Sequence, residues 1–452
     1  MNSLISRVKR FFAEDLTLSR VLKNTGYLFS SNTFSLGLSF IQSIFAARLL
    51  GIAAFGLVGI VTSFVSNVNR LFSFRMGEFI IRYLGKELTE ENTEKAGAVV
   101  KVAMLTEAIT SLFAFGFLFL VAPLGAKYIA KDMEALPMIQ FFSVSILASA
   151  VYESSLGVLQ ITNHFRTQAA INLLQSLLTA VIIVAAFFLN GSIYTILAAY
   201  LIGKIILGIS PAILAQYHLR RHLHPQWWKA SMRLLPPFKE MARYTISTNL
   251  SGTIKMVANE SDPLWVGFFL DKSAVGLYKL ALSIINPLMM PITPFITTSF
   301  PEMARSVVSK SWKQLRRLLR RMTIISASWT IFVTLVMALC GRWLIGLIYT
   351  EEFVPAYPAT MILLAGFGIS NIFFWNRSLL LSFGKANIPL YVLFVAAVLK
   401  VTLSFWVIPT FGINGAAWLL SGNFILTVAV LVIIGLALVR RNEAHEDVGV
   451  LK

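Results

Sequence analysis

The chain has 452 residues, of which 57% are hydrophobic and only 13% are charged, and its mean hydropathy is +0.74. Soluble domains carry about 25% Asp, Glu, Lys and Arg, so this chain cannot cover a water-facing surface. The same composition, with a single cysteine, excludes disordered, collagen-like and disulfide-rich secreted classes. In a soluble protein a net charge of +18 would suggest nucleic-acid binding. Whether it does so here depends on where the basic residues lie along the chain.

A helix needs about 20 apolar residues to cross the hydrocarbon core, and twelve stretches of the chain meet this requirement. The expected spans are 25–47, 54–75, 98–122, 137–160, 167–189, 193–216, 244–270, 275–300, 322–348, 358–382, 387–409 and 413–439. The sequence thus predicts an all-α polytopic membrane protein with twelve transmembrane helices. Residues 1–23 lack the continuous apolar stretch of a signal peptide, and we expect them to form a cytoplasmic amphipathic segment.

The basic residues alternate between the two sides of the membrane as the positive-inside rule requires. With the N-terminus inside, the outer connections hold five Lys or Arg residues: Arg48, Lys127, Lys131, Lys272 and Arg342. This alternation holds across all twelve predicted spans, and it predicts that both termini are cytoplasmic. Most of the net charge therefore orients the protein and faces anionic lipid, so we expect the phospholipid bilayer and no nucleic acid as a partner.

The chain divides into two similar blocks of six spans. A basic cytoplasmic linker, 217–243, separates an N-lobe (24–216) from a C-lobe (244–439), and a cytoplasmic tail (440–452) follows. Shifting the chain by 220 residues aligns Leu50 to Leu57 with Leu270 to Leu277, with identity at four positions that include Gly56 and Gly276. Because tandem halves are a common way to build transporters, we predict two pseudo-symmetric six-helix lobes.

The first span of each block carries a stripe of polar residues at helical spacing. The two stripes, which match at the same offset, are Ser251, Lys255, Asn259 and Asp262 in the C-lobe and Ser31, Ser35, Ser39 and Gln42 in the N-lobe. They suggest a pair of helices that line one water-filled space. The alternative is that the Ser and Gln side chains simply join neighbouring helices.

These stretches carry a resemblance to a known family. The residues concerned are Arg48, Leu50, Gly51, Phe55 and Gly56 after the first span, Asp262, Gly267, Val275, Gly276 and Tyr278 around the seventh and eighth, and Pro301. In these motifs the chain resembles the polysaccharide-transporter, or Wzx-type O-antigen flippase, branch of the MOP exporter superfamily. It departs from the usual turn by having Asp271 where the first half has Gly51.

The resemblance implies two lobes that alternate around a central cavity in the cytoplasmic (inner) membrane. It further implies a flippase that moves an undecaprenyl-pyrophosphate-linked oligosaccharide, a repeat of O-antigen, capsule or exopolysaccharide, to the outer leaflet. Glycan polymerase or export machinery would be further partners. A multidrug or organic-cation exporter of the same superfamily and a lipid II flippase are the alternatives.

Charged residues inside the spans are the candidates for transport, because burying them in lipid is costly. Lys204, Lys255, Arg377 and Lys400 lie near the middle of spans, and Arg48 and Asn259 join them as candidate cavity residues. Cations can replace the hydration of a pyrophosphate headgroup. The alternative is that each cation pairs with a local acid in a structural ion pair.

Four acids inside spans, Glu107, Glu153, Glu260 and Asp262, are candidate coupling sites or counter-ions. Glu260 and Asp262 are two residues apart and therefore face opposite sides of a helix, which predicts different neighbours. The eighth span contains Pro287, Pro291 and Pro294, which predict a bent helix.

Motifs for other chemistry are missing from the sequence. There is no G-x-x-x-x-G-K-[ST] loop for ATP, no H-E-x-x-H metal motif, no nucleophile elbow and no long outer loop. We therefore expect a transporter without cofactor or metal rather than an enzyme, with an ion gradient or the membrane potential as the drive.

Overall fold

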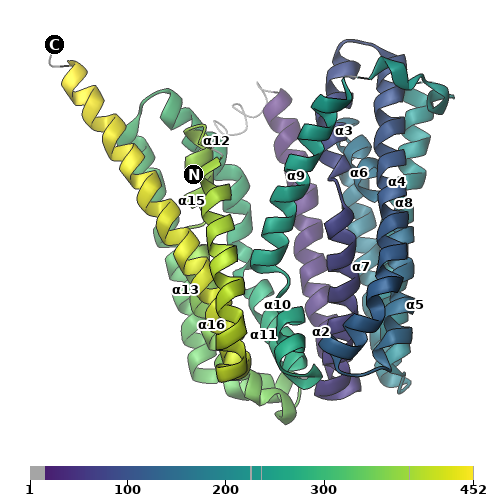
Figure 1. Ribbon diagram of the computed structural model, residues 1–452. Coiled ribbons are helices and arrows are strands. Elements are labelled where there is room, and N and C mark those ends of the chain that lie inside the picture. Colours follow the sequence, from purple (N-terminus) through teal and green to yellow (C-terminus); the bar gives the residue numbers. More distant parts are fainter. Residues whose placement is uncertain (1–15, 224–225, 236, 386, 451–452) are drawn as a thin grey trace, which may run out of the picture.

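The computed structural model describes residues 16–223, 226–235, 237–385 and 387–450, which form helices and connections without a strand (Figure 1). The helices of the first half are α2 (Leu16–Phe72), α3 (Met76–Thr89), α4 (Thr93–Leu124), η1 (Gly125–Ala130), α5 (Ala135–Ala148), α6 (Tyr152–Ile161), α7 (Phe165–Phe188) and α8 (Ile193–His222). The short turns η2 (Trp227–Lys229) and η3 (Met232–Leu234) follow. The second half has α9 (Phe238–Asn259), α10 (Asp262–Phe269), α11 (Lys272–Met289), η4 (Met290–Ile292), α12 (Thr293–Val308), α13 (Trp312–Ile348), η5 (Glu351–Ala356), α14 (Tyr357–Ile372), α15 (Asn376–Ser382) and α16 (Asn387–Val450).

The predicted all-α membrane fold is confirmed. Within the described residues, eight helical stretches are long and apolar enough to cross a membrane. Two of them contain 64 and 57 residues, which is far more than one crossing needs. They bend sharply at Gly51 (φ 70°) and Gly412 (φ 61°), a left-handed backbone conformation that glycine adopts without strain. The count of twelve crossings stays a prediction.

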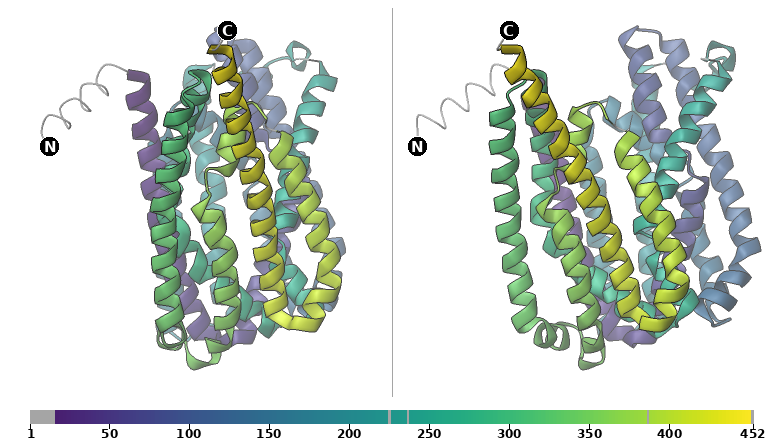
Figure 2. Two further views of the ribbon diagram at one scale, coloured as in Figure 1. Left: turned by 90° about the vertical axis from the view of Figure 1, so that its left-hand side faces the viewer. Right: turned by 60° about the vertical axis from the view of Figure 1, so that its left-hand side comes forward.

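The helices form two groups that meet at one end of the molecule. Figure 1 shows α2–α8 on one side, α12–α16 on the other and α9–α11 between them. The beginning of α2 and the end of α16 lie at the same end of the bundle in both views of Figure 2. The cytoplasmic location of that end stays a prediction. Of the predicted amphipathic segment 1–23, residues 1–15 lie outside the described part.

The two lobes contact each other through the glycine pair that the internal repeat equates. A Cβ atom added to Gly56 would overlap the backbone carbonyl of Lys272, and one added to Gly276 would overlap the carbonyl of Ile52. Ile52 and Lys272 are themselves 220 positions apart. This reciprocal contact, in which each residue meets its partner's equivalent, is the signature of a two-fold relation.

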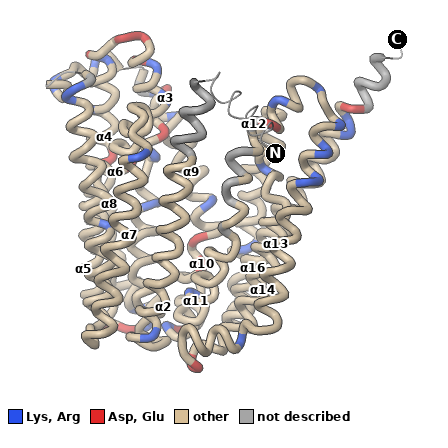
Figure 3. Tube along the Cα trace, turned by 180° about the vertical axis from the view of Figure 1, so that it is seen from behind, with Lys and Arg blue, Asp and Glu red and all other residues tan. Residues whose placement is uncertain are grey.

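Further contacts between the lobes lie at the end away from the termini. Lys131 donates to the carbonyl of Leu270, and the Lys272 ammonium lies 2.6 Å from Asp132 Oδ2. The Lys272 hydrogen bond lowers the pKa of the Asp132 carboxyl below its ordinary value. At the second turn Asp271 Oδ1 accepts the backbone N–H of Ala274, so a helix cap takes the place of the left-handed glycine of the first half. Charged residues gather at both ends of the bundle, with few between (Figure 3).

At the termini end, the linker and the first turns of α9 pack on the N-lobe. The buried Trp227 lies against Gly97 of α4, and Lys101 donates to the carbonyl of Ala230 at 3.1 Å. Met241 of α9 belongs to one apolar cluster with Met76 of α3. Within the linker predicted at 217–243, the described residues Trp227, Ala230 and Met241 therefore pack against the N-lobe.

For the polar stripe of the first span, the contacts favour the alternative that its side chains join neighbouring helices. In α2, Ser31 Oγ donates to the carbonyl of Ala169 at 2.6 Å, and Gln42 Nε2 donates to that of Ser176 at 2.9 Å. Both acceptors belong to α7, so Ser31 and Gln42 join two helices, whereas Ser39 is exposed and bonds the Ser35 carbonyl of its own helix. The proline-rich eighth span is interrupted, as predicted, by the short turn η4 between α11 and α12.

Candidate functional site

Two polar cavities, one inside the N-lobe and one between the N-lobe and α9, adjoin each other and share Arg70, Ser73 and Glu153. The first, of about 240 Å³, is enclosed by α2, α4, the α5–α6 break and α8. The second, of about 250 Å³, lies between the α2–α3 break and α9. We call them together the polar cavity. Its charged lining residues are Arg70, Arg75, Glu107, Glu153, Lys204, Lys255 and Glu260.

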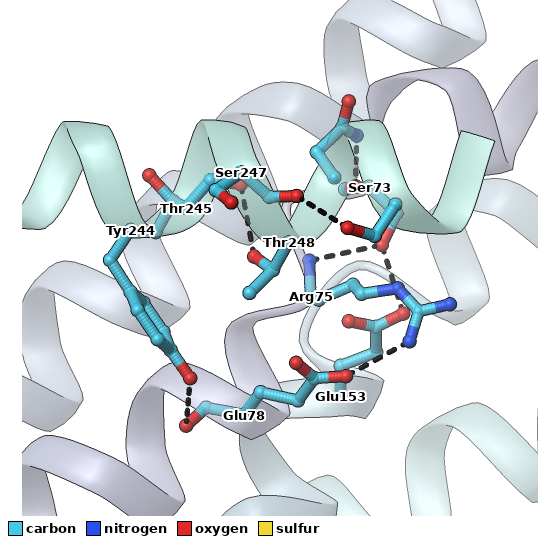
Figure 4. Close-up of polar contacts among 10 residues, drawn as sticks. Ser73, Arg75, Glu78, Glu153, Tyr244, Thr245, Ser247 and Thr248 are labelled. Atoms are coloured by element: carbon cyan, nitrogen blue, oxygen red, sulfur yellow. Dashed lines mark hydrogen bonds and ion pairs between the residues drawn. The ribbon is translucent and has the colours of Figure 1, made fainter. Parts of the chain in front are cut away.

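The break between α2 and α3 forms one wall of the polar cavity. Arg75 has a left-handed backbone (φ 51°), which is uncommon for a residue with a side chain and marks a constrained site. Ser73 Oγ donates to Glu153 Oε1 at 2.9 Å and lies 3.4 Å from the Arg75 backbone nitrogen (Figure 4). Asn249 of α9 donates to the carbonyl of Ser73, which the interrupted helix leaves without an intrahelical partner.

The break between α5 and α6 forms the opposite wall. The Glu107 carboxylate of α4 accepts the backbone N–H groups of Glu153 at 2.7 Å and Ser154 at 2.9 Å. It thereby caps the first turn of α6, where free N–H groups and the helix dipole favour a negative charge. Glu107 is thus engaged with backbone donors and does not pair with Lys204 or Lys400. Glu153 faces the α2–α3 break instead.

Arg70 and Glu260 connect the two lobes across the polar cavity. The Arg70 guanidinium of α2 forms an ion pair with Glu260, which lies between α9 and α10. Arg75 packs its guanidinium against Gly252 of α9, where a Cβ would come within 3.0 Å of it. Two arginines of the N-lobe thus contact the C-lobe, Arg75 at Gly252 within α9 and Arg70 at Glu260 just after α9.

Three of the four cations proposed from the sequence lie exposed around this site. Lys204 lines the first cavity and Lys255 lines the second. Arg377 of α15 is exposed, and its charge acts on Lys255 together with those of Arg75 and Arg70. Among the described residues, the side chains of Lys204, Lys255 and Arg377 form no hydrogen bond or ion pair.

The fourth cation, Lys400 of α16, is placed differently. Its ammonium lies 2.7 Å from Asp262 Oδ1 and donates to the carbonyl of Ala258, also at 2.7 Å. The two side chains are only 3% and 4% exposed, so the pair is closed to solvent. Asn259 accepts a hydrogen bond from Asn423 at 3.0 Å in the same C-lobe region. As their spacing predicts, Asp262 and Glu260 meet different neighbours.

Arg48 lies far along α2 from the polar cavity, next to the bend at Gly51. Its Nε donates to the carbonyls of Ile348 at 2.8 Å and Tyr349 at 2.9 Å, and its Nη2 donates to the carbonyl of Leu347. These are the free carbonyls at the end of α13, where a cation is favoured. Arg48 therefore joins the lobes at the end away from the termini.

Arg70 and Arg75 were missed as candidates from the sequence. The predicted second span ended at residue 75, which placed both arginines at a membrane boundary. In the structure the helix resumes as α3, whose buried Met76, Phe79 and Ile80 continue an apolar face. That helical spacing was readable from the sequence and would have put the arginines in the interior of a longer, broken helix.

Comparison with known proteins assigns the family. The profile of the family described as "Polysaccharide biosynthesis protein" matches residues 45–358, which is more than half of the chain. The chain is 21% identical to "Inner membrane protein YghQ" of Escherichia coli (strain K12), over 77% of this chain and 98% of that protein. It is 23% identical to "Teichuronic acid biosynthesis protein TuaB" of Bacillus subtilis (strain 168), over 63% of this chain and 56% of that protein.

Solved structures agree on the fold. A multidrug resistance MATE family transporter of the MOP superfamily, in an inward-facing conformation, has a TM-score of 0.74 at 12% identity and covers 91% of this chain and 96% of its own. The lipid II flippase MurJ, in an inward closed conformation, has a TM-score of 0.70 at 14% identity and covers 90% of this chain and 87% of its own. The chain is thus a multi-pass membrane protein that belongs to the polysaccharide biosynthesis protein family and has the fold of the MOP superfamily.

Proposed function

We propose that the protein is a flippase that moves a lipid-linked oligosaccharide across the cytoplasmic membrane, with the pyrophosphate headgroup held in the polar cavity. The observation that carries this proposal is the set of exposed cations without a protein counter-ion among the described residues: Lys204, Lys255 and Arg377. A polyanion that leaves water needs cations and hydrogen-bond donors to replace its hydration. The assigned family supports a glycan as the cargo.

The proposed cycle alternates between two arrangements of the lobes. In the described arrangement the lobes are joined away from the termini, by the Gly56–Gly276 contact and by Arg48. With cytoplasmic termini, this arrangement admits substrate from the inner leaflet. Separation of those contacts and closure at the other end would release it to the outer leaflet.

The charge of the substrate offers a drive that needs no ATP. An inside-negative membrane potential favours outward movement of an anion by about 2.3 kcal/mol per charge per 100 mV. Glu153, which faces the α2–α3 break beside Arg75, is the acid best placed to couple a proton to the same movement. A cavity with unpaired cations disfavours the alternative of a multidrug exporter for organic cations.

The test is rescue of a bacterial strain that lacks its glycan flippase. Lys204→Ala, Lys255→Ala and Arg377→Ala are scored singly and together for mature surface glycan at matched membrane expression. We expect each single variant to reduce export and the triple variant to abolish it. Lys127→Ala is the matched control, because Lys127 is exposed at the other end of the bundle. Full export by the triple variant would refute the proposal.

A further inference from the structure

We infer that the pocket between α3, α4 and α9 holds the first part of the polyprenyl chain of the lipid whose headgroup lies in the polar cavity. This pocket has a volume of about 260 Å³ and a lining that is almost wholly apolar. Its lining residues are Phe74, Met76, Phe79, Val102, Ala103, Thr106, Met241, Ala242, Thr245 and Ile246. The inference rests on the proposed function and adds a second subsite to it.

The apolar pocket and the polar cavity share their walls. At the α2–α3 break, Phe74 lines the apolar pocket while its neighbours Ser73 and Arg75 line the polar cavity. On α4, Thr106 lines the pocket and Glu107 the cavity. At both places adjacent residues line the two spaces, and consecutive Cα atoms are about 3.8 Å apart.

On α9 the two linings follow each other along the helix. Thr245 lines the apolar pocket, and Asn249, one turn further along, lines the polar cavity. One turn advances about 5.4 Å. A lipid pyrophosphate joins its charged group directly to its hydrocarbon chain, so one molecule can occupy both spaces only if they adjoin in this way.

Charge and polarity select this occupant over an apolar ligand alone. A hydrocarbon chain fits the pocket because its lining offers almost no polar group. Arg75 and Lys255 of the adjoining polar cavity match an anionic group at the end of that chain. Ile246, which is 58% exposed, marks the side on which the chain continues outward.

The test uses the full-length protein in nanodiscs of phosphatidylethanolamine and phosphatidylglycerol. The probe is a polyprenyl pyrophosphate with a photoreactive diazirine on its hydrocarbon chain, and the labelled residues are mapped by mass spectrometry. We expect labels on α3, α4 and α9 at the pocket, and we expect unlabelled polyprenyl pyrophosphate to compete for them. A phosphatidylglycerol with the same diazirine serves as the second probe.

Variants that fill the pocket sharpen the result. Ala242→Phe from α9 and Thr106→Phe from α4 are each expected to lower pocket labelling at least about fivefold. Ala185→Phe on an exposed face of α7 is the matched control and is expected to leave it unchanged. Labels spread evenly over the lipid-facing helices, unchanged labelling in both filled variants, or equal labelling by the phosphatidylglycerol probe would overturn the inference.

The assay separates this inference from the proposed function because it measures binding and needs no translocation. Competed labels at the pocket in a protein that fails to export glycan would uphold the chain-binding site and refute the function. Glycan export by a protein without labels at the pocket would uphold the function and refute the chain-binding site.

Discussion

Replacing Lys400 with methionine removes one member of a buried ion pair and leaves the other uncompensated. Asp262 Oδ2 is buried and already lacks a hydrogen-bond partner, and Asp262 Oδ1 would lose its contact at 2.7 Å. Breaking a buried pair on one side costs about 3–5 kcal/mol, and the 3% and 4% exposure of the side chains allows no rescue by solvent. We therefore expect Lys400→Met to lower the unfolding midpoint strongly.

The double variant Lys400→Met with Asp262→Asn removes both charges and should recover most of that stability. Replacing both partners of a buried ion pair is often neutral, because the cost of desolvating two charges disappears with their attraction. The assay is thermal unfolding of purified protein in detergent, with all variants compared under one condition. A single variant as stable as the wild type, or a double variant as unstable as the single one, would refute this reasoning.

Three smaller predictions concern the contacts between the lobes. Arg48→Ala leaves the carbonyls at the end of α13 without their cation and should cost about 1.5–3 kcal/mol, measured as a lower unfolding midpoint than that of Lys127→Ala. Gly276→Ala forces a Cβ against the carbonyl of Ile52 and should separate the lobes, measured as a longer spin-label distance between α2 and α11. The control Gly116→Ala, which has open space around it, should leave that distance unchanged. Because the Lys272 hydrogen bond lowers the pKa of Asp132, the pair contributes stability above the ordinary carboxyl pKa of about 4 and loses it as the pH falls through the lower folded value. Lys272→Met should therefore lower stability at pH 7 and have a progressively smaller effect as the pH falls through that lowered pKa, measured as unfolding midpoints over a pH series.

The fold was predictable because it follows from apolar content and repeated sequence. Helices that cross lipid must satisfy their own backbone, so long apolar stretches read directly as helices. From the sequence, Gly56 and Gly276 could only be aligned with each other as equivalent positions. The structure shows in addition that they contact each other. The continuation of the helix beyond the break between α2 and α3 was not predicted, because hydropathy falls at the polar residues that line the cavity.

The site was predictable in its residue types and only partly in its partners. Lys255 and Lys400 look alike as midspan cations, yet one faces an open cavity and the other a buried acid. Such pairing depends on the packing of helices far apart in the chain, about which spacing within one helix carries no information. Glu107 shows the same limit, because its acceptor role depends on a helix break 46 residues away.

The central claim is that unpaired cations in the polar cavity, together with Arg377 near it, carry the headgroup of a lipid-linked glycan. The most direct measurement is transfer of a fluorescent undecaprenyl-pyrophosphate oligosaccharide between the leaflets of proteoliposomes. The transfer is monitored by adding a membrane-impermeant quencher outside, which quenches only the fluorophores in the outer leaflet. The account predicts transfer by the wild type and by Lys127→Ala, and none above protein-free liposomes by the triple variant Lys204→Ala, Lys255→Ala, Arg377→Ala. Equal transfer by the triple variant and the wild type would contradict it.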